Sequence, residues 1–416
     1  MSFLLNLHGP SEPIETACSS SLVAIHRSVR AIQAGDCDQA IAGGVNTMVV
    51  PWVHIAFAKA GMLCADGRCK AFSKDANGYV RGEGVGMLFL KRLSCAERDG
   101  DHIHGLIRAT SENHGGRANS LTAPNPKAPA ELIKAAFAEA RIDPRRVSYI
   151  ETHGTGTQLG DPIEINGLKL AFSDMFAHGD GAGAGESRCG LGSVKSNIGH
   201  LELAAGVAGV IKVLLQMRHR TLVKTLHCEE INPYIDFADS PFYLVRETQP
   251  WEAQHAPDGQ QLPRMAGVSS FGFGGVNAHV LIEEYVAPAR AADEGSAQRP
   301  ALIVLSARTE DRLHEQARQL LAHVERRAYG DDRLASIAYT LQMGRDAMDV
   351  RLAFTVHSID ELRQRLTGYL EGRSELHAER YHGEARKNRD ALSVLSADED
   401  AAALLRLWLS KHKHDK

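Results

Sequence analysis

The sequence contains no hydrophobic run long enough to cross a membrane. Its most apolar stretch, residues 203–217, is shorter than the roughly 20 residues that a spanning helix needs, and it includes Lys212. The first ten residues have no basic segment and only a short apolar run, so they do not resemble a secretory signal. We therefore expect neither membrane insertion nor secretion.

Cysteine is scarce, and neither sign of charge is in large excess. The seven cysteines show no dense spacing pattern, which fits a reducing compartment better than a disulfide framework. Lys and Arg number 47 against 51 Asp and Glu, so the net charge of −4 offers no general attraction to nucleic acid or anionic membranes. With 44% hydrophobic residues, the composition is that of a globular protein with a large core, and we expect it in the cytoplasm.

Several common catalytic and cofactor signatures are missing. The sequence has no Gly-x-Ser-x-Gly elbow and no phosphate-binding loop, and residues 154–160 miss the dinucleotide-binding spacing by one residue. Cys64 and Cys69 have no matching second pair, which argues against a structural zinc site. Metal and nucleotide cofactors are therefore not indicated.

One segment has the composition of a linker. Residues 287–299 are polar and rich in Ala and Pro, which divides the chain into a first region, 1–286, and a small unit, 300–372. Residues 373–416 are predicted to be a charged, partly helical tail that is cut at its end. In the small α/β unit the apolar spacing predicts strands at 301–306 and 350–356 and helices near 313–324, 334–343 and 359–370.

The first region alternates predicted strands and helices. A helix behind Cys18 is predicted by the apolar stripe Leu22, Ile25, Val29 and Ile32, and it ends at Gly35. Strands are predicted at 39–45, 147–151 and 189–194, and Asp161, Pro162 and Glu164 predict a helix start with a capping box. This alternation, with polar loops at the strand ends, favours a layered α/β fold.

Cys18 differs from the other cysteines because it lies just before a predicted helix amino terminus. There, unpaired N–H groups and the helix dipole stabilise a thiolate, whereas a cysteine elsewhere is usually an inert small hydrophobe. His153 and His200 each lie in a loop at a strand end, where α/β sheets gather their ligands. One cysteine and two such histidines make nucleophilic acyl chemistry plausible.

Four motifs occur in order along the first region. They are Glu-Thr-Ala-Cys-Ser-Ser-Ser-Leu at 15–22, His-Gly-Thr-Gly-Thr at 153–157, Lys-Ser-Asn-Ile-Gly-His at 195–200 and Gly-Phe-Gly-Gly-Val-Asn-Ala-His at 272–279. Together they resemble the β-ketoacyl synthase domain of modular type I polyketide synthases, within the thiolase superfamily. The resemblance covers 1–286 and implies a thiolase-like layered α/β fold, and 300–372 resembles the α/β linker domain that follows such ketosynthases.

The resemblance also implies partners. Substrates would arrive on the phosphopantetheine of acyl carrier protein, with no cofactor bound directly, and the full-length form would be a homodimer. No acyltransferase follows the small unit, and residues 7–14 are similar to the lead-in of modules served by a free-standing acyltransferase. Nucleic acid and membranes are not expected as partners.

The implied reaction is a decarboxylative condensation. Cys18 would take the acyl chain from its carrier, with the backbone N–H groups of Cys18 and Phe273 cradling the thioester oxygen. His153 and His200 would donate hydrogen bonds to the enolate that a malonyl unit forms as it loses carbon dioxide. The carbanion would then attack the acyl group on Cys18 to give a β-ketoacyl thioester, without a metal.

Other motif residues are expected to support this chemistry. The resemblance assigns a supporting ion pair to Lys195 and Glu164, pantetheine contacts to Thr155 and Thr157, and gating to Phe273. Asn277 is a further supporting residue, and His26 and His279 are interpreted as structural. The plainer alternatives are a solvated lysine, a capping acid, loop hydrogen bonds between threonines and core packing of Phe273.

The main departure from the family pattern lies before the cysteine. The family places half of a duplicated fold there, whereas 17 residues precede Cys18 here. We therefore expect an exposed apolar sheet face, and we expect residues 1–416 alone to pack loosely and lack activity while 300–372 folds separately. Two alternatives to condensation stay open: an inactive or non-elongating fragment that only docks acyl carrier protein, and an acyl-thioester hydrolase that needs only Cys18 and one histidine.

Overall fold

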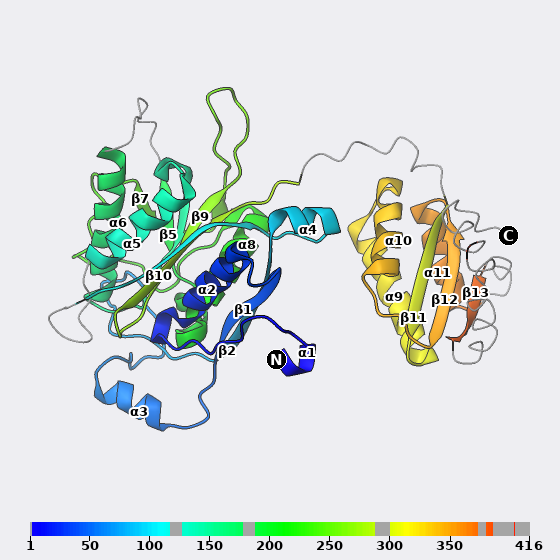
Figure 1. The fold of residues 1–416 in the computed structure, drawn as a ribbon, viewed down its shortest axis with the longest axis horizontal. Coiled ribbons are helices and arrows are strands. Elements are labelled where there is room, and N and C mark those ends of the chain that lie inside the picture. Colours follow the sequence, from blue (N-terminus) through cyan, green and yellow to red (C-terminus); the bar gives the residue numbers. More distant parts are fainter. Residues whose placement is uncertain are drawn as a thin grey trace. The chain divides into compact units, whose positions relative to one another are not determined.

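The computed structural model divides the chain into two compact units, Met1–Ala287 and Pro288–Lys416 (Figure 1). The structure describes residues 2–116, 127–177, 188–287, 300–372, 380–385 and 403. The expected linker at 287–299 therefore lies outside the described residues, apart from Ala287. Each unit is described by itself.

The first unit contains eight helices among its described residues. They are α1 (Ser2–Leu5), α2 (Ser20–Ala34), α3 (Trp52–Lys59), α4 (Leu93–Asp99), α5 (Lys127–Ala140), α6 (Gly160–Ala177), α7 (Lys195–Ile198) and α8 (Ala205–His219). Short 3₁₀ turns occupy Ala17–Ser19, Pro144–Arg146 and Glu202–Ala204. The strands are β1 (Gln39–Asn46), β2 (Gly84–Lys91), β3 (Leu106–His114), β4 (Tyr149–Glu151), β5 (Cys189–Gly192), β6 (Thr221–Leu222), β7 (Phe242–Leu244), β8 (Gln249–Pro250), β9 (Met265–Phe271) and β10 (Val276–Glu283).

A six-stranded sheet forms the centre of this unit, in the order β3-β10-β9-β4-β5-β7. Strands β3, β10 and β9 pair antiparallel, whereas β9, β4, β5 and β7 run parallel to one another. The carboxyl ends of β4 and β5 therefore lie at the same edge of the sheet. The loop after β4 carries His153, and helix α7, which begins with Lys195, follows β5, so the topology alone brings the two motifs together.

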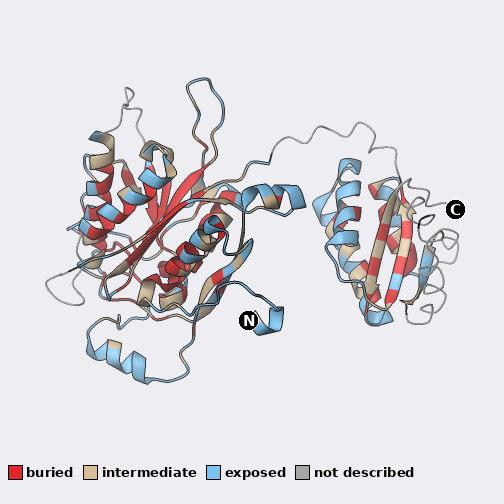
Figure 2. Cartoon of the chain, in the orientation of Figure 1, coloured by how far each residue is buried: buried red, intermediate tan, exposed pale blue. Residues whose placement is uncertain are grey.

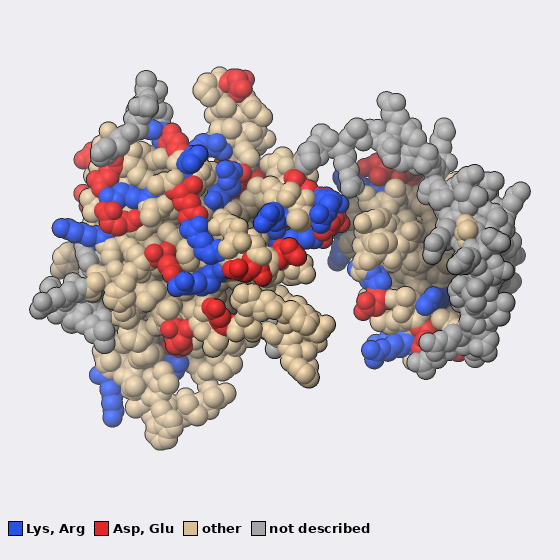
Figure 3. Space-filling view, in the orientation of Figure 1, with Lys and Arg blue, Asp and Glu red and all other residues tan. Residues whose placement is uncertain are grey.

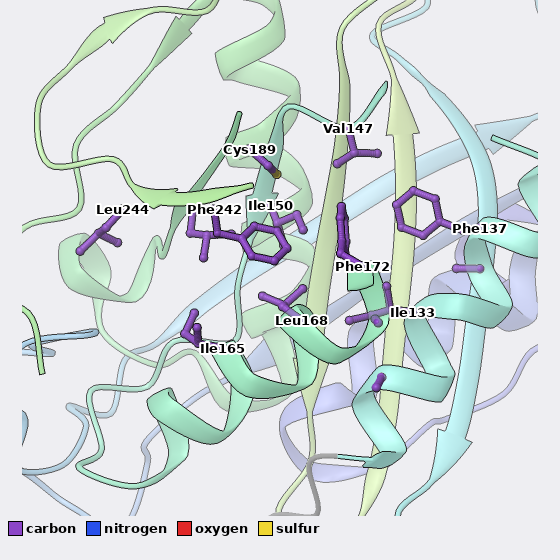
Figure 4. Packing of buried hydrophobic residues seen from close by; sticks show 14 of the residues in the cluster. Ile133, Phe137, Val147, Ile150, Ile165, Leu168, Phe172, Cys189, Phe242 and Leu244 are labelled. Atoms are coloured by element: carbon purple, nitrogen blue, oxygen red, sulfur yellow. The ribbon is translucent and has the colours of Figure 1, made fainter. Parts of the chain in front are cut away.

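Helices α5 and α6 cover one face of the sheet. Their apolar side chains form a core with β4, β5 and β7, which Figure 4 shows from close by. The rings of Phe137 and Phe172 pack edge to face with centroids 5.5 Å apart, and Phe172 packs against Phe242 at 4.8 Å. Ile150 points into this core, while its neighbour Tyr149 belongs to the core on the opposite face, as strand alternation requires.

Helices α2 and α8 cover the other face. Of the predicted α2 stripe, Leu22, Ile25 and Ile32 are buried and Val29 is half-buried, and Gly35 ends the helix with a φ of 86°. The ribbon of β1 and β2 adds a further layer, since Ala42 and Leu88 join the same core. These layers confirm the α/β fold expected from the sequence.

The ribbon turns its other face outward. Ile41 pairs with Phe89 and Val45 with Val85 across the two strands, and these four side chains are exposed, together with Met87. The expectation of an exposed apolar sheet face is therefore confirmed. Helix α3 also buries none of its residues (Figure 2).

Charge is mixed on the face of this unit that is turned to the viewer in Figure 3. On the face that Figure 3 shows, Lys and Arg side chains alternate with Asp and Glu, and no broad field of one sign is present. This mixture agrees with the net charge of −4. None of the helices among the described residues has both the length and the apolarity needed to cross a bilayer.

The described residues of the second unit form a small three-stranded sheet with three α-helices. Its elements are β11 (Ala301–Ala307), α9 (Glu310–Arg327), α10 (Leu334–Met343), β12 (Val350–Val356), α11 (Ile359–Leu370) and β13 (Arg380–Glu384). All strand pairs are antiparallel, in the order β11-β12-β13. The five elements predicted before residue 372 are confirmed. Strand β13 lies within 373–416, where a charged, partly helical tail was predicted and no strand was; most of this segment lies outside the described residues, so its helical content stays a prediction.

Candidate active site

Three residues from separate parts of the first unit meet in one pocket. Cys18 precedes α2, His153 follows β4, and His200 follows α7; one sulfur or ring nitrogen from each lies within 4.8 Å of the others. The two imidazole rings stand edge to face with centroids 5.6 Å apart. All three line a cavity of about 640 Å³. The structure thus brings together the three residues predicted to be catalytic.

The turn that carries Cys18 is held by the side chains of its own motif. Ala17 has a left-handed φ of 55°, and its N–H donates to Oε1 of Glu15 at 2.9 Å. Oγ of Ser20 accepts from the N–H of Thr16 at 2.9 Å and donates to the carbonyl of Ala17 at 2.7 Å. The acid, the threonine and the serine of the motif therefore position the cysteine.

Two close approaches fix this turn against its surroundings. Oγ of Ser21 accepts the N–H of Val207 at 3.0 Å, which joins α2 to α8. A Cβ atom on Gly272 would lie 2.5 Å from the carbonyl oxygen of Thr16, so that position requires glycine. The glycine-rich loop before β10 can approach Cys18 only because of this residue.

The thiol of Cys18 is neutral in the resting site. Burial raises its pKa from 9.0 to about 11, while the positive charge of Lys195 and the backbone N–H groups of Phe273 and Cys18 lower it less. The prediction that the helix start stabilises the thiolate of Cys18 is therefore wrong. Desolvation by the protein atoms around the sulfur outweighs the helix dipole and the N–H groups. Both predicted oxyanion donors nevertheless face the sulfur.

The backbone of His153 is held from both sides. Its N–H donates to Oε1 of Glu164 at 2.7 Å, and its carbonyl accepts from Nζ of Lys195 at 2.5 Å. The second carboxylate oxygen of Glu164 accepts the N–H of Gly154 at 2.8 Å. Burial, and then the charges of Lys195 and His200, hold the pKa of His153 well below its usual value, so the imidazole is neutral.

The tautomer of His200 follows from its contacts. Its Nδ1 atom accepts the backbone N–H of Glu202 at 2.8 Å, so the neutral ring carries its proton on Nε2. That Nε2 atom is buried and has no hydrogen-bond partner among the described residues. Burial, together with the charges of Lys195 and Arg81, keeps the pKa of His200 well below its usual value. The ring therefore offers a hydrogen-bond donor at neutral pH.

Lys195 and Glu164 do not pair directly. The expected ion pair is absent among the described residues because each group is bound to the backbone around His153 instead. Burial lowers the pKa of Lys195 and raises that of Glu164 to about 7. The capping box predicted from Asp161 and Glu164 is also wrong: α6 begins at Gly160, and Asp161 accepts the N–H of Phe72 at 2.7 Å.

The remaining predicted residues also line the cavity. The hydroxyl oxygens of Thr155 and Thr157 lie 3.2 Å apart, and their contact with pantetheine stays a prediction. Phe273 is 42% exposed, which excludes a core-packing role, and its ring meets that of Phe57 edge to face at 6.3 Å. Asn277 is buried and donates to Oδ1 of Asn113 at 3.0 Å.

Two histidines were interpreted as structural, and their contacts agree with that role. Nδ1 of His26 lies 2.8 Å from the hydroxyl of Thr110, and Nδ1 of His279 lies 2.9 Å from that of Ser269. Both histidines are buried in the helix and sheet layers. Neither lines the cavity that contains Cys18, His153 and His200.

Two buried ion pairs near the site were missed from the sequence. Glu151 pairs with Lys212, and Arg81 pairs with Glu202. Glu151 and Glu202 lie near motif histidines in the sequence, and this proximity was the one sequence signal that could have identified them as members of the site. Their partners lie 61 and 121 residues away and have no motif of their own.

Cys18, His153 and His200 are also donor types that metals use. A metal needs the lone pair of a ring nitrogen, whereas Nε2 of His200 carries a proton and its Nδ1 is occupied by the N–H of Glu202. The trio is therefore built as a hydrogen-bonding site around a thiol. It fits a carbonyl or enolate oxygen better than a cation.

Comparison with known families agrees with this geometry. Residues 1–96 match the Beta-ketoacyl synthase, N-terminal domain, and residues 104–229 match the Beta-ketoacyl synthase, C-terminal domain. Residues 304–373 match the RhiE-like, KS-MAT linker domain. The two ketosynthase matches include all three pocket residues, and the linker match covers most of the second unit.

Similar proteins are large synthases and their ketosynthase domains. Polyketide synthase PksN of Bacillus subtilis is 53% identical over the whole chain, and polyketide synthase ThaG of Burkholderia thailandensis is 49% identical over 93% of it. The chain spans 8% and 7% of the lengths of these two relatives.

Solved structures show the same fold. The ketosynthase from module 6 of the bacillaene synthase of Bacillus subtilis is 42% identical, with a TM-score of 0.84 over 99% of this chain and 68% of that one. The oxazolomycin ketosynthase domain OzmH KS7 of Streptomyces albus is also 42% identical, with a TM-score of 0.80 over 92% of this chain and 64% of that one. The chain thus belongs to the β-ketoacyl synthase family, as a thiolase-like ketosynthase domain of polyketide synthases followed by a ketosynthase linker domain.

Proposed function

We propose that the first unit catalyses decarboxylative Claisen condensation in polyketide biosynthesis, with Cys18 as the nucleophile. The observation that carries this proposal is the meeting of one neutral thiol with two neutral imidazoles within 4.8 Å. A thiol hydrolase would need a single histidine beside its cysteine. Two neutral imidazoles beside the sulfur suit stabilisation of an enolate oxygen.

The first half-reaction is a thiol exchange. The sulfur of Cys18 attacks the thioester of an acyl chain on carrier protein, a new carbon–sulfur bond forms, and the bond to the pantetheine sulfur breaks. The proton of the Cys18 thiol leaves with the pantetheine sulfur, so charge balances. The N–H groups of Cys18 and Phe273, which lower the pKa of the resting thiol, stabilise the oxygen as negative charge develops on it.

The second half-reaction forms the carbon–carbon bond. A malonyl thioester loses carbon dioxide, and the electron pair of the broken bond passes into an enolate whose oxygen accepts hydrogen bonds from Nε2 of His200 and from His153. The enolate carbon attacks the acyl carbonyl on Cys18, and the bond to sulfur breaks. The Cys18 thiolate takes up a proton from solvent as the β-ketoacyl product leaves.

The partners belong to the same proposal. Phosphopantetheine of acyl carrier protein would enter along Thr155 and Thr157, which line the cavity with Cys18. The chain needs no cofactor of its own in this scheme. A free-standing acyltransferase would supply the malonyl group indirectly, a homodimer would be the full-length form, and the cytoplasm would be its compartment.

The test follows both half-reactions in the purified full-length form, because residues 1–416 alone are expected to lack activity. With an acyl-carrier substrate and malonyl carrier protein, intact-mass measurement should show acylation of Cys18, and product analysis should show the β-ketoacyl thioester. The Cys18→Ala variant should lose both signals, whereas Cys95→Ala, at a half-buried cysteine outside the cavity, should keep them. Free acid without a condensed product would favour a hydrolase. Carrier binding without acylation would favour a docking fragment.

A further inference from the structure

The turn that presents His200 is unusual in its backbone. The N–H of His200 donates to the carbonyl of Val80 at 2.6 Å, and its carbonyl accepts the N–H of Gly82 at 2.8 Å, so His200 lies opposite Arg81 in an isolated parallel bridge. Two residues later, Glu202 has a left-handed φ of 46°. That conformation is unfavourable for a residue with a Cβ atom, and something must hold it.

The turn from His200 to Glu202 has a direct chemical result. It places the N–H of Glu202 2.8 Å from Nδ1 of His200, to which it donates. If the turn opened and Glu202 moved away, Nδ1 would lose its donor. The proton of His200 could then move between its two ring nitrogens.

A buried ion pair holds the same turn. Arg81 donates two hydrogen bonds to the Glu202 carboxylate, from Nε to Oε1 at 2.5 Å and from Nη2 to Oε2 at 2.8 Å. The side chains of Arg81 and Glu202 are 4% and 12% exposed. The guanidinium carbon of Arg81 also lies 5.5 Å from the ring centre of Phe57. Residues 80–82 therefore bond to the backbone of His200 and, through Arg81, also hold the side chain of Glu202.

We infer that Arg81 and Glu202 are positioning residues for His200: their ion pair keeps the Glu202 N–H on Nδ1 and so keeps the imidazole proton on Nε2. This inference rests on the proposed function, because a fixed Nε2–H matters for hydrogen bonding to the enolate oxygen. Neither residue needs to touch the reacting atoms. The positive charge of Arg81 also favours the neutral imidazole.

The pair should affect the two half-reactions unequally. Acylation depends on Cys18 and on backbone N–H groups, whereas decarboxylation depends on the donor nitrogen of His200. The charge of Glu202 also raises the pKa of the Cys18 thiol, so its removal should not slow acylation. In Glu202→Ala, condensation by pre-acylated protein should slow about tenfold, the effect expected for losing one oriented hydrogen bond. Glu202→Gly should recover part of this loss, because glycine adopts a left-handed φ without strain.

The deciding measurement does not depend on activity. In ¹⁵N-histidine-labelled protein, with the His200 signals assigned through His200→Gln, the wild type should show an unprotonated Nδ1 and a protonated Nε2. Glu202→Ala should show a mixture of tautomers. Arg81→Lys keeps the positive charge but cannot make both hydrogen bonds to the Glu202 carboxylate. It should show a proportion of the two tautomers between those of the wild type and Glu202→Ala, and it serves as the test where Glu202→Ala folds poorly.

A matched control comes from another buried pair. Arg264 binds Glu284 through Nη1 at 3.0 and 2.8 Å, with side chains 5% and 17% exposed, away from the cavity. Arg264→Met should destabilise the fold and leave the His200 signals unchanged. A wild-type His200 protonated on Nδ1, or a Glu202→Ala variant with unchanged tautomer and condensation, would overturn the inference. If the wild type does not condense but its tautomer responds as described, the proposed function fails while the positioning effect stands.

Discussion

Glu151, which is close in sequence to His153, forms a buried ion pair with Lys212, with 2.7 Å between Oε2 and Nζ. The same Oε2 atom accepts the hydroxyl of Tyr149 at 2.7 Å, and Oε1 accepts the N–H of Val194 at 2.5 Å. Strand β4, helix α8 and the loop before Lys195 are thus joined at one carboxylate. The pair connects the sheet and helix α8 to the segment before Lys195, and both of its charged side chains are almost fully buried.

Removing the cation should therefore destabilise the first unit. Lys212→Met leaves the Glu151 carboxylate buried without its counter-charge, and we expect a loss of about 3 to 5 kcal/mol in the free energy of unfolding by urea. The double variant Glu151→Gln, Lys212→Met should recover much of this loss. Lys224→Met, at an exposed lysine, should change the stability by less than about 0.5 kcal/mol. Equal effects at Lys212 and Lys224 would contradict the importance of the pair.

The ionisation of Cys18 predicts an unusual pH profile for alkylation. Because burial raises the pKa of this thiol to about 11, its thiolate fraction should rise tenfold per pH unit, roughly, up to pH 10. Iodoacetamide labelling of Cys18, followed by peptide mass mapping, should show no plateau over that range. A plateau below pH 9 would mean that the thiol is activated in the resting site.

Replacing the histidines should separate the two half-reactions. His153→Ala or His200→Ala should leave acylation of Cys18 largely in place and suppress condensation, by a factor of about 100 or more. Acyl-enzyme and β-ketoacyl product would be followed in parallel. Equal loss of both signals would instead assign a histidine to activation of the cysteine.

The two imidazoles of the site should stay neutral in mild acid. Both imidazoles must be neutral to donate to the enolate, and burial holds their pKa values well below 6.5. The two imidazoles should therefore not titrate as the pH falls from 7.5 to 6, and any change in the condensation rate of pre-acylated protein over that range should come mainly from Glu164, whose pKa is about 7. The stability of the fold, in contrast, should depend on pH. Below pH 6.5 these two histidines bind protons in the unfolded state but stay neutral in the folded state, so the free energy of unfolding decreases as the pH falls. A rate that halves near pH 6.5 in Glu164→Gln as well as in the wild type would show that a histidine is exposed.

The glycine-rich loop offers a matched pair of substitutions. A Cβ atom at Gly272 would lie 2.5 Å from the carbonyl of Thr16, whereas one at Gly274 meets nothing within 4 Å. Gly272→Ala should displace the N–H of Phe273 and slow acylation about 100-fold, as loss of an oxyanion donor does. Gly274→Ala should acylate normally. Similar rates for the two variants would remove Phe273 from the proposed oxyanion site.

Local patterns in the sequence predicted much of the fold. The α2 stripe, its end at Gly35 and five elements of the second unit follow from spacing along the chain, where each signal lies within a few residues. Strand β13 was missed because Arg380–Glu384 is short, carries no apolar alternation and pairs with β12 alone. A strand of this kind forms only because its partner is already present.

The candidate site was predicted from motifs, but its electrostatics were not. The pKa of Cys18 depends on how closely residues from distant segments, Lys195 and Phe273 among them, enclose the sulfur. The absence of a Lys195–Glu164 contact depends on two backbone N–H groups that compete for the same carboxylate. Burial and competition of this kind are properties of the assembled site, and no single segment contains them.

The neutral thiol of Cys18 has a consequence for oxidative damage. With a pKa of about 11, only about one sulfur in ten thousand is a thiolate at pH 7, and peroxides attack the thiolate. A freely diffusing oxidant therefore meets an unreactive group, whereas a thioester in the pocket would, in the proposed reaction, find N–H donors for its oxygen. Desolvation of the sulfur thus lowers its reactivity towards oxidants and would keep the proposed nucleophile reduced between turnovers.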